Sequence, residues 1–207
     1  MSRDDAPIKL RAGETTVAKP SREQAEAAVQ TLIQWAGDDP AREGLVGTPD
    51  RVLRAYDEFY GGYGEDPVAT LQKAMEPAGG YDDMVLLRGI RFASHCEHHM
   101  ITIVGTANVA YVPDASMVGI SKLARVVEVF ARRLQIQEAM TAQIAQAIED
   151  AIAPRGVAVV IDAEHQCMTT RGIQRPGMTT VTSRMLGCFK TDPERRREVM
   201  GLISSHG

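Results

Sequence analysis

The chain has 207 residues, of which 44% are hydrophobic and 24% charged, so it can form a sizeable core and is not expected to be wholly disordered. A net charge of −4 and only 5% aromatic residues argue against a general nucleic-acid-binding protein. No apolar run reaches the roughly 18 residues of a membrane span, and the three cysteines, an odd number, do not indicate a disulfide framework. The first residues carry two acids and no apolar stretch, so we expect no secretory signal, no membrane partner and a cytoplasmic location.

The N-terminal part of the chain is predicted to be an arm followed by helices. Residues 1–20 show no hydrophobic periodicity, which favours a mobile arm. A capping box predicts a first helix, proline at the first helical position predicts a second, and an Asp-Pro pair predicts a third. These helices begin at Ser21, Thr48 and Asp66, and the first two end near Gly37 and Gly61. Residues 21–80 are therefore predicted to form a helical extension.

The remaining residues, 81–207, are predicted to form an α+β domain. Runs rich in Val, Ile and Leu predict strands, and apolar residues at helical spacing predict helices. The strands are expected over residues 84–92, 101–112, 156–168 and 179–189, and the helices over 121–134, 136–152 and from 192. Two strands, two long helices and two further strands favour an antiparallel four-stranded sheet with both long helices on one face.

Histidines and cysteines gather in two clusters. One cluster is Ser94-His95-Cys96-Glu97-His98-His99 and the other is His165-Gln166-Cys167. Cys96 and His99 stand three residues apart, so a turn would bring their side chains together, while strand alternation would place Cys167 on the apolar face of its strand. Two thiolates and one imidazole suit zinc, and they leave a fourth position for water, as in catalytic zinc sites.

The residues alone leave alternatives open at these clusters. The cysteines could be buried thiols and the histidines ordinary core or surface groups. Spacing does not decide which histidine would bind a metal. Histidines beyond the ligand set could transfer protons near neutral pH.

A second set of candidates is cationic. Ser121, Lys122 and Arg125 lie at the start of a predicted helix, where an anion is stabilised by free N–H groups and the helix dipole. Arg171 follows Cys167 by four residues. These cations favour a multiply charged phosphate ligand, although a solvated helix face is the alternative. Glu138 in a first helical turn would ordinarily interact with the helix dipole, but it could also accept the paired N–H donors of a guanine.

Several segments together resemble the GTP cyclohydrolase I family. They are Cys96-Glu97-His98-His99, Gly119 to Arg125, Gln135 to Glu138, His165-Gln166-Cys167, Arg171 to Gln174 and Thr179 to Ser183. Their order and spacing are similar to those of the family over roughly residues 22–205. Several linked motifs over this length are more specific than any one of them.

The resemblance implies a tunnelling fold and an enzyme. The family fold is an antiparallel sheet with two helices on one side, assembled as a homodecamer of two stacked pentamers with active sites between subunits. The implied reaction converts GTP and water into 7,8-dihydroneopterin triphosphate and formate, the first step of folate or tetrahydrobiopterin synthesis. A non-catalytic zinc- or nucleotide-binding subunit and a related purine or pterin enzyme are the alternatives.

The resemblance also implies a role for individual residues. The zinc ligands would be Cys96, His99 and Cys167, and the proton-transfer residues His98 and His165. The residues that bind GTP would be Glu138 as the guanine anchor with Gln137 beside it, Ser121, Lys122, Arg125 and Arg171 at the triphosphate, and Arg51 from another subunit. The departures from the family pattern are His95 before the first cysteine, Ala139-Met140 after the glutamate, and Cys188, which we interpret as a buried thiol.

Overall fold

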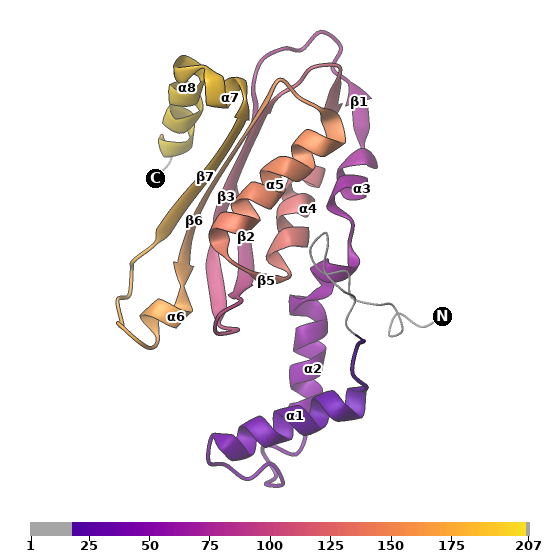
Figure 1. The fold of residues 1–207 in the computed structure, drawn as a ribbon, viewed down its shortest axis with the longest axis vertical. Helices are drawn as coiled ribbons and strands as arrows, with labels where there is room; N and C mark the ends of the chain where they lie inside the picture. Colours follow the sequence, from indigo (N-terminus) through magenta and orange to yellow (C-terminus); the bar gives the residue numbers. More distant parts are fainter. Residues whose placement is uncertain (1–17, 206–207) are drawn as a thin grey trace. The chain divides into compact units, whose positions relative to one another are not determined.

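The computed structural model describes residues 18–205, which form two compact units (Figure 1). One unit ends at Gly64 and the other begins at Glu65. The predicted arm lies almost entirely in residues 1–17, outside the described residues. The domain boundaries after residues 20 and 80 stay predictions, and the third expected helix lies in the second unit.

The first unit is helical, as its sequence predicts. Its elements are α1 (Arg22–Trp35), α2 (Thr48–Phe59) and the 3₁₀ helix η2 (Gly61–Gly64). The capping box is present, because the Gln24 N–H donates to the Ser21 hydroxyl at 3.2 Å and the Ser21 N–H donates to the Gln24 amide oxygen at 2.9 Å. Pro49 lies in the first turn of α2, where its missing N–H costs no hydrogen bond.

The second unit combines strands and helices. Its strands are β1 (Met75–Pro77), β2 (Val85–Cys96), β3 (Thr102–Val112), β4 (Ser116–Val118), β5 (Leu134–Gln135), β6 (Gly156–His165) and β7 (Thr180–Gly187). Its helices are α3 (Pro67–Gln72), α4 (Ile120–Ala131), α5 (Gln137–Ile152), α6 (Gln166–Thr169), α7 (Cys188–Thr191) and α8 (Pro193–Ser204). The larger sheet has the order β5-β2-β3-β6-β7, and the two short strands β1 and β4 pair separately.

The main sheet has the predicted architecture. Strands β2, β3, β6 and β7 are antiparallel, whereas the two-residue β5 pairs in parallel with β2. Helices α4 and α5 cover one face of this sheet (Figure 1). The predicted tunnelling fold, with four antiparallel strands, two helices on one face and N-terminal helices, is therefore confirmed.

The main core lies between these helices and the sheet. Leu123 and Val127 from α4, Ile144 and Ile148 from α5, and Val159 from β6 are all fully buried. Each helix pair stands four residues apart, so both members lie on the face that packs on the strands. None of the helices in the described range is long and apolar enough to cross a membrane.

A smaller core occupies the opposite face of the sheet, which the sequence did not predict. Ala158 and Met185 project from that face and pack with Phe189 of α7 and Val199 of α8. The alternation of side chains along β6 accounts for the two cores, because Ala158 lies between residues that face the main core.

Two predicted strands end earlier than expected. The strand expected over residues 156–168 ends at His165, where the chain turns into α6. The strand expected over residues 179–189 ends at Gly187, which has a φ of 54°. A Cβ on Gly187 would lie 2.2 Å from the Arg155 carbonyl oxygen, so only glycine fits this bend before α7.

Candidate metal centre and active site

A tight turn between β2 and β3 holds Cys96 and His99. The N–H of Met100 donates to the Cys96 carbonyl oxygen at 2.8 Å, which closes one helix-like turn after the last residue of β2. Met100 has a φ of 54°, in the left-handed region in which such turns commonly end. The turn places side chains three residues apart on one side, so the predicted proximity of Cys96 and His99 has its structural basis here.

Cys167 reaches the same place from a helix, and the prediction that it continues a strand is wrong. It lies in the single turn α6, in which the N–H of Thr170 donates to the Gln166 carbonyl oxygen at 2.9 Å. His165 is the last residue of β6 and pairs with Ile103 of β3. The helical turn, rather than the alternation of a strand, therefore directs the Cys167 thiol.

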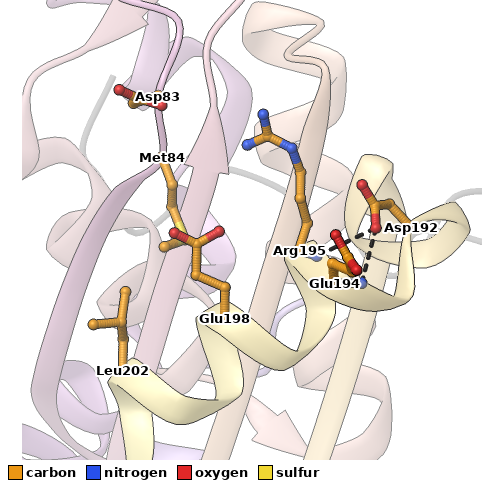
Figure 2. A pocket seen from close by; sticks show the side chains of 7 residues that line it. All are labelled: Asp83, Met84, Asp192, Glu194, Arg195, Glu198 and Leu202. Carbon is orange, nitrogen blue, oxygen red and sulfur yellow. Dashed lines mark hydrogen bonds between the residues drawn. The ribbon is translucent and has the colours of Figure 1, made fainter.

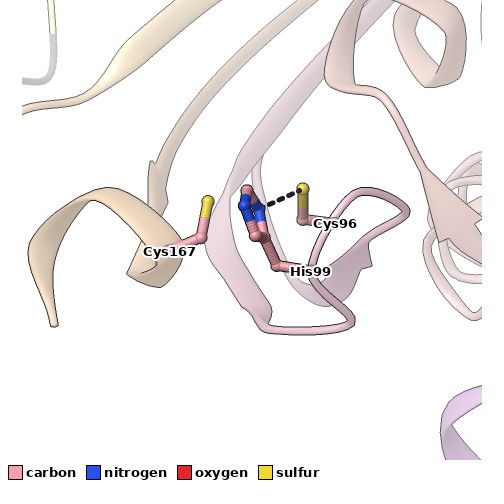
Figure 3. A group of neighbouring side chains, drawn as sticks. All are labelled: Cys96, His99 and Cys167. Atoms are coloured by element: carbon pink, nitrogen blue, oxygen red, sulfur yellow. Dashed lines mark hydrogen bonds between the residues drawn. The ribbon is translucent and has the colours of Figure 1, made fainter. Parts of the chain in front are cut away.

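The three potential ligand atoms converge (Figure 3). One ligand atom from each of Cys96, His99 and Cys167 lies within 4.8 Å of the others, and the Cys96 sulfur is 4.0 Å from Nδ1 of His99. Tetrahedral zinc holds such atoms roughly 3.5 to 3.8 Å apart, given Zn–S and Zn–N bonds of about 2.3 and 2.0 Å. Small rotations of the side chains would close this difference. The donor set and its geometry therefore fit zinc.

His98 lies beside this group without belonging to it. Its Nδ1 is 3.6 Å from the Cys96 sulfur, which is shorter than the corresponding distance for His99. Among the histidines of the described residues, however, only His99 joins Cys96 and Cys167 in a group whose ligand atoms all lie within 4.8 Å of one another. His99 therefore stays the predicted ligand, and His98 is a neighbouring exposed imidazole. His95, the departure from the family pattern, is 6% exposed and lies outside the ligand group.

Burial changes the acid–base properties of Cys167. Burial and the adjacent Cys96 raise the pKa of the Cys167 thiol, and Arg171 acts in the opposite direction. Without a metal, this thiol is therefore more strongly protonated than an exposed cysteine at the same pH. Metal binding would displace its proton, since the thiolate is the ligand.

His165 is held at the end of β6 by a buried amide. Its Nε2 lies 2.8 Å from the amide oxygen of Gln137, the first residue of α5. Burial lowers the pKa of His165, whereas the negative charge of Glu138 raises it. Glu138 itself is exposed in the first turn of α5. The structure thus brings Gln137 and Glu138 close to His165, and their shared role in one site stays a prediction.

The predicted cations of α4 lie in its first two turns. Ser121 and Arg125 are exposed and Lys122 is half-buried. The Arg125 guanidinium donates to Glu128 at 2.8 Å and to Glu65 at 3.2 Å. Ion pairs this exposed contribute about 0–1 kcal/mol, so they would not prevent the arginine from exchanging a carboxylate for a phosphate.

The two remaining arginines have different positions. Arg171 is exposed in the loop after α6, and its charge acts on the Cys167 thiol, so it lies near the group formed by Cys96, His99 and Cys167. Arg51 lies in α2 of the first unit. Its assignment to the triphosphate site of another subunit stays a prediction.

An open hollow of about 660 Å³ lies beside α8 (Figure 2). Four carboxylates and one arginine line it with Met84 and Leu202. One of these carboxylates, Asp192, caps α8 by accepting the N–H groups of Glu194 and Arg195. None of the candidate site residues lines this hollow, and its acidic rim does not suit a triphosphate.

Two supporting residues were not predicted from the sequence. Thr141 of α5 and Thr182 of β7 have hydroxyl oxygens 2.7 Å apart, and Thr182 also contacts the Gln137 amide nitrogen. Thr182 lies in a segment that resembles the family, but nothing in the sequence indicated a role for its hydroxyl. Only the register that pairs Thr182 with Ile161 shows that it faces α5.

Comparisons with known proteins agree with the motifs. A family model described as GTP cyclohydrolase I matches residues 25–204. GTP cyclohydrolase 1 of Maricaulis maris is 57% identical over 89% of this chain and 90% of that protein. GTP cyclohydrolase 1 of Allorhizobium ampelinum is 53% identical over 97% of this chain and 99% of that protein. A solved structure of the archaeosine synthase QueF-Like in the apo form is 17% identical, with a TM-score of 0.42 over 50% of this chain and 93% of that one.

Proposed function

Because the chain belongs to the GTP cyclohydrolase I family, we propose that Cys96, His99 and Cys167 bind zinc at the centre of its active site. The protein is an enzyme that converts GTP and water into 7,8-dihydroneopterin triphosphate and formate. The observation that supports the zinc proposal most strongly is the convergence of two thiols and one imidazole within 4.8 Å. Three protein ligands leave a fourth position free, as in catalytic zinc sites.

The bound ion would supply Lewis-acid activation of water near neutral pH. The chain's own residues orient the purine and move protons. Carbon C8 of guanine is a poor electrophile until N7 is protonated. His98, whose Nδ1 is 3.6 Å from the Cys96 sulfur, and His165, two residues before Cys167, are the imidazoles proposed for this proton transfer. A purely structural metal site would need neither of them, which favours a catalytic centre over a non-catalytic subunit.

We propose that separate groups of residues bind the guanine base and the triphosphate of GTP. Exposed Glu138, whose charge acts on His165, is suited to accept two N–H donors from the guanine edge. The cations Lys122, Arg125 and Arg171 are suited to bind the phosphates, with Ser121 as a hydroxyl donor. Arg51 completes the proposed substrate-binding set, whereas the Gln137 side chain, predicted beside Glu138, contacts His165.

The proposed assembly is a homodecamer of two stacked pentamers. It rests on the family and on the exposed apolar side chains of the first unit, among which Trp35 is 88% exposed. We also propose a cytoplasmic location, since all three cysteines are free thiols. A role in folate or tetrahydrobiopterin synthesis follows from the reaction product.

The zinc proposal is tested by comparing two cysteine variants of the assembled protein. Cys167→Ser removes a proposed ligand. Cys188→Ser removes a thiol that packs beside the smaller core and is half-buried, not buried as predicted from the sequence. We expect Cys167→Ser to lose bound zinc and GTP turnover together, because a hydroxyl is a poor replacement for thiolate. Cys188→Ser should keep both. Metal content by elemental analysis and formate release are the two measurements, and full zinc occupancy in Cys167→Ser would contradict the ligand set.

A further inference from the structure

A buried network of hydrogen-bonded polar groups contacts His165. Gln137 and Thr141 are each only 1% exposed, so their side chains cannot rely on water for hydrogen bonds. The two hydrogens of the Gln137 amide nitrogen are shared among three acceptors, which are the Thr180 carbonyl oxygen at 2.7 Å, Thr182 Oγ1 at 3.1 Å and the Ile161 carbonyl oxygen at 3.3 Å. This hydrogen-bond network joins α5 to β6 and β7 at the end of the sheet where the proposed metal ligands lie.

The donor and acceptor of each hydrogen bond in this network can be assigned. Thr141 Oγ1 donates to the Gln137 carbonyl oxygen at 2.7 Å, so its one hydrogen is used. The Thr182 hydroxyl must then donate to Thr141 Oγ1, 2.7 Å away, and accept from the Gln137 amide. Carbonyl oxygens only accept, so the Gln137 group that faces Thr180 and Thr182 must be its NH₂.

This orientation determines the proton on His165. If the NH₂ of Gln137 faces β7, its amide oxygen is the atom 2.8 Å from Nε2 of His165. An amide oxygen only accepts, so Nε2 carries the hydrogen of this bond. In the neutral ring, Nδ1 then carries the free lone pair, and the ring can donate a proton to the substrate only after Nδ1 has taken one up.

We propose that Gln137 is a positioning residue, which holds the His165 ring with hydrogen on Nε2 and leaves Nδ1 as the nitrogen that meets the substrate. The inference rests on the proposed role of His165 in proton transfer. It differs from direct binding of guanine by Gln137, because both ends of the amide are already engaged inside the protein. The fixed ring orientation would act on turnover rather than on GTP binding.

The first test is steady-state kinetics of zinc-loaded Gln137→Met, whose side chain has similar length but no amide. Loss of the hydrogen-bond partner of a metal-binding histidine lowers metal affinity or activity by about 10- to 100-fold, and we take the same range for the partner of His165. We expect kcat to fall in that range and KM to change by less than about threefold, with unchanged zinc content. A matched control is Gln135→Met, since Gln135 is 2% exposed and its amide donates to the Phe130 carbonyl oxygen rather than to a histidine. This control should keep kcat.

Other outcomes of the kinetic test overturn the proposal. A rise in KM with unchanged kcat would show that Gln137 binds substrate directly. A lower melting temperature with unchanged kcat would show a purely structural role. If Gln137→Met does not fold, Thr182→Val tests the same hydrogen-bond network, because it removes a hydroxyl that accepts from the Gln137 amide. It should lower kcat by a smaller factor without raising KM, and an unchanged kcat there would contradict the proposal.

A second readout does not depend on activity. In ¹⁵N-histidine-labelled protein, NMR distinguishes a nitrogen that carries hydrogen from one that does not, and the His165→Gln variant identifies the His165 signals. We expect a neutral His165 with hydrogen on Nε2 in the unsubstituted protein and a mixture of tautomers in Gln137→Met. Hydrogen on Nδ1 in the unsubstituted protein would overturn the inference, whereas absence of GTP turnover with the expected tautomer would contradict only the proposed function.

Discussion

At the scale of single residues, the proposed ligands depend on two short turns. Met100 closes the first turn with its positive φ, and the single turn of α6 directs Cys167. The sequence predicted the first arrangement, because a three-residue spacing matches one turn. It could not predict the second, because the alternating pattern runs through His165 to Cys167 without a glycine or proline that would mark the end of the strand.

The role of His165 is testable by its removal. We expect His165→Ala to keep its zinc, since the ligand group does not include His165. Loss of a general acid or base lowers the rate by about 10²- to 10⁴-fold, so turnover of GTP should fall in that range. Zinc content and formate release measured on the same sample separate the two effects. Loss of zinc from His165→Ala would mean that His165 is a ligand.

At the scale of elements, the sequence predicted the helices and long strands of the sheet well. Their apolar residues recur at helical or alternating spacing, as Ile144 and Ile148 do in α5. The short strands β1, β4 and β5 were missed, since two or three residues carry no periodicity. The packing of α7 and α8 on the opposite face was also missed, because it depends on which alternate residues of β6 remain uncovered.

Tyr111 connects two of these elements, β3 and β4. Its buried hydroxyl donates to the Val118 carbonyl oxygen at 3.3 Å and accepts from the Val118 N–H at 3.1 Å. Tyr111→Phe removes both bonds and leaves buried polar groups without their partner, so we expect it to lower the free energy of unfolding by about 1–3 kcal/mol. Denaturant titrations of both proteins at neutral pH measure this difference.

The same pair of proteins should differ in pH dependence. Burial raises the pKa of Tyr111 above its ordinary value of 10.0, so the folded state favours the neutral phenol. Its contribution is therefore complete below about pH 10 and is lost as the pH rises through the raised pKa. The stability difference between the unsubstituted protein and Tyr111→Phe should shrink above about pH 10. A constant difference up to pH 11 would contradict this expectation. Tyr60, whose pKa burial raises to about 12, is present in both proteins and cancels.

At the scale of the whole molecule, the two units differ in how they bury apolar side chains. The second unit encloses two apolar cores, one on each face of its main sheet, whereas α1 of the first unit has no buried residue. Leu32, Trp35 and Val46 are 64%, 88% and 69% exposed. In the proposed decamer, neighbouring copies of the chain would bury these exposed side chains. The sequence analysis implied this assembly only by family resemblance, because a helical pattern does not show what its apolar side contacts.

The assembly is testable by sedimentation. We expect the unsubstituted protein to have about ten times the mass of one chain. Leu32→Asp should shift it toward smaller species, because a charge would replace an apolar side chain at a contact. Gln30→Asp is the matched control on the same helix, since Gln30 is an exposed polar residue, and it should leave the mass unchanged. A mass of one chain at the concentrations that support turnover would contradict the decamer.

The central claim is that a metal held by Cys96, His99 and Cys167 enables this chain to open the guanine ring of GTP. The most direct measurement is formate release from GTP by the purified protein, with the pterin product detected as fluorescent neopterin after oxidation. We expect equal amounts of both products, their loss on treatment with a chelator, and their recovery when zinc is restored. Absence of both products from zinc-loaded, assembled protein, or turnover that a metal-free sample retains, would contradict the account.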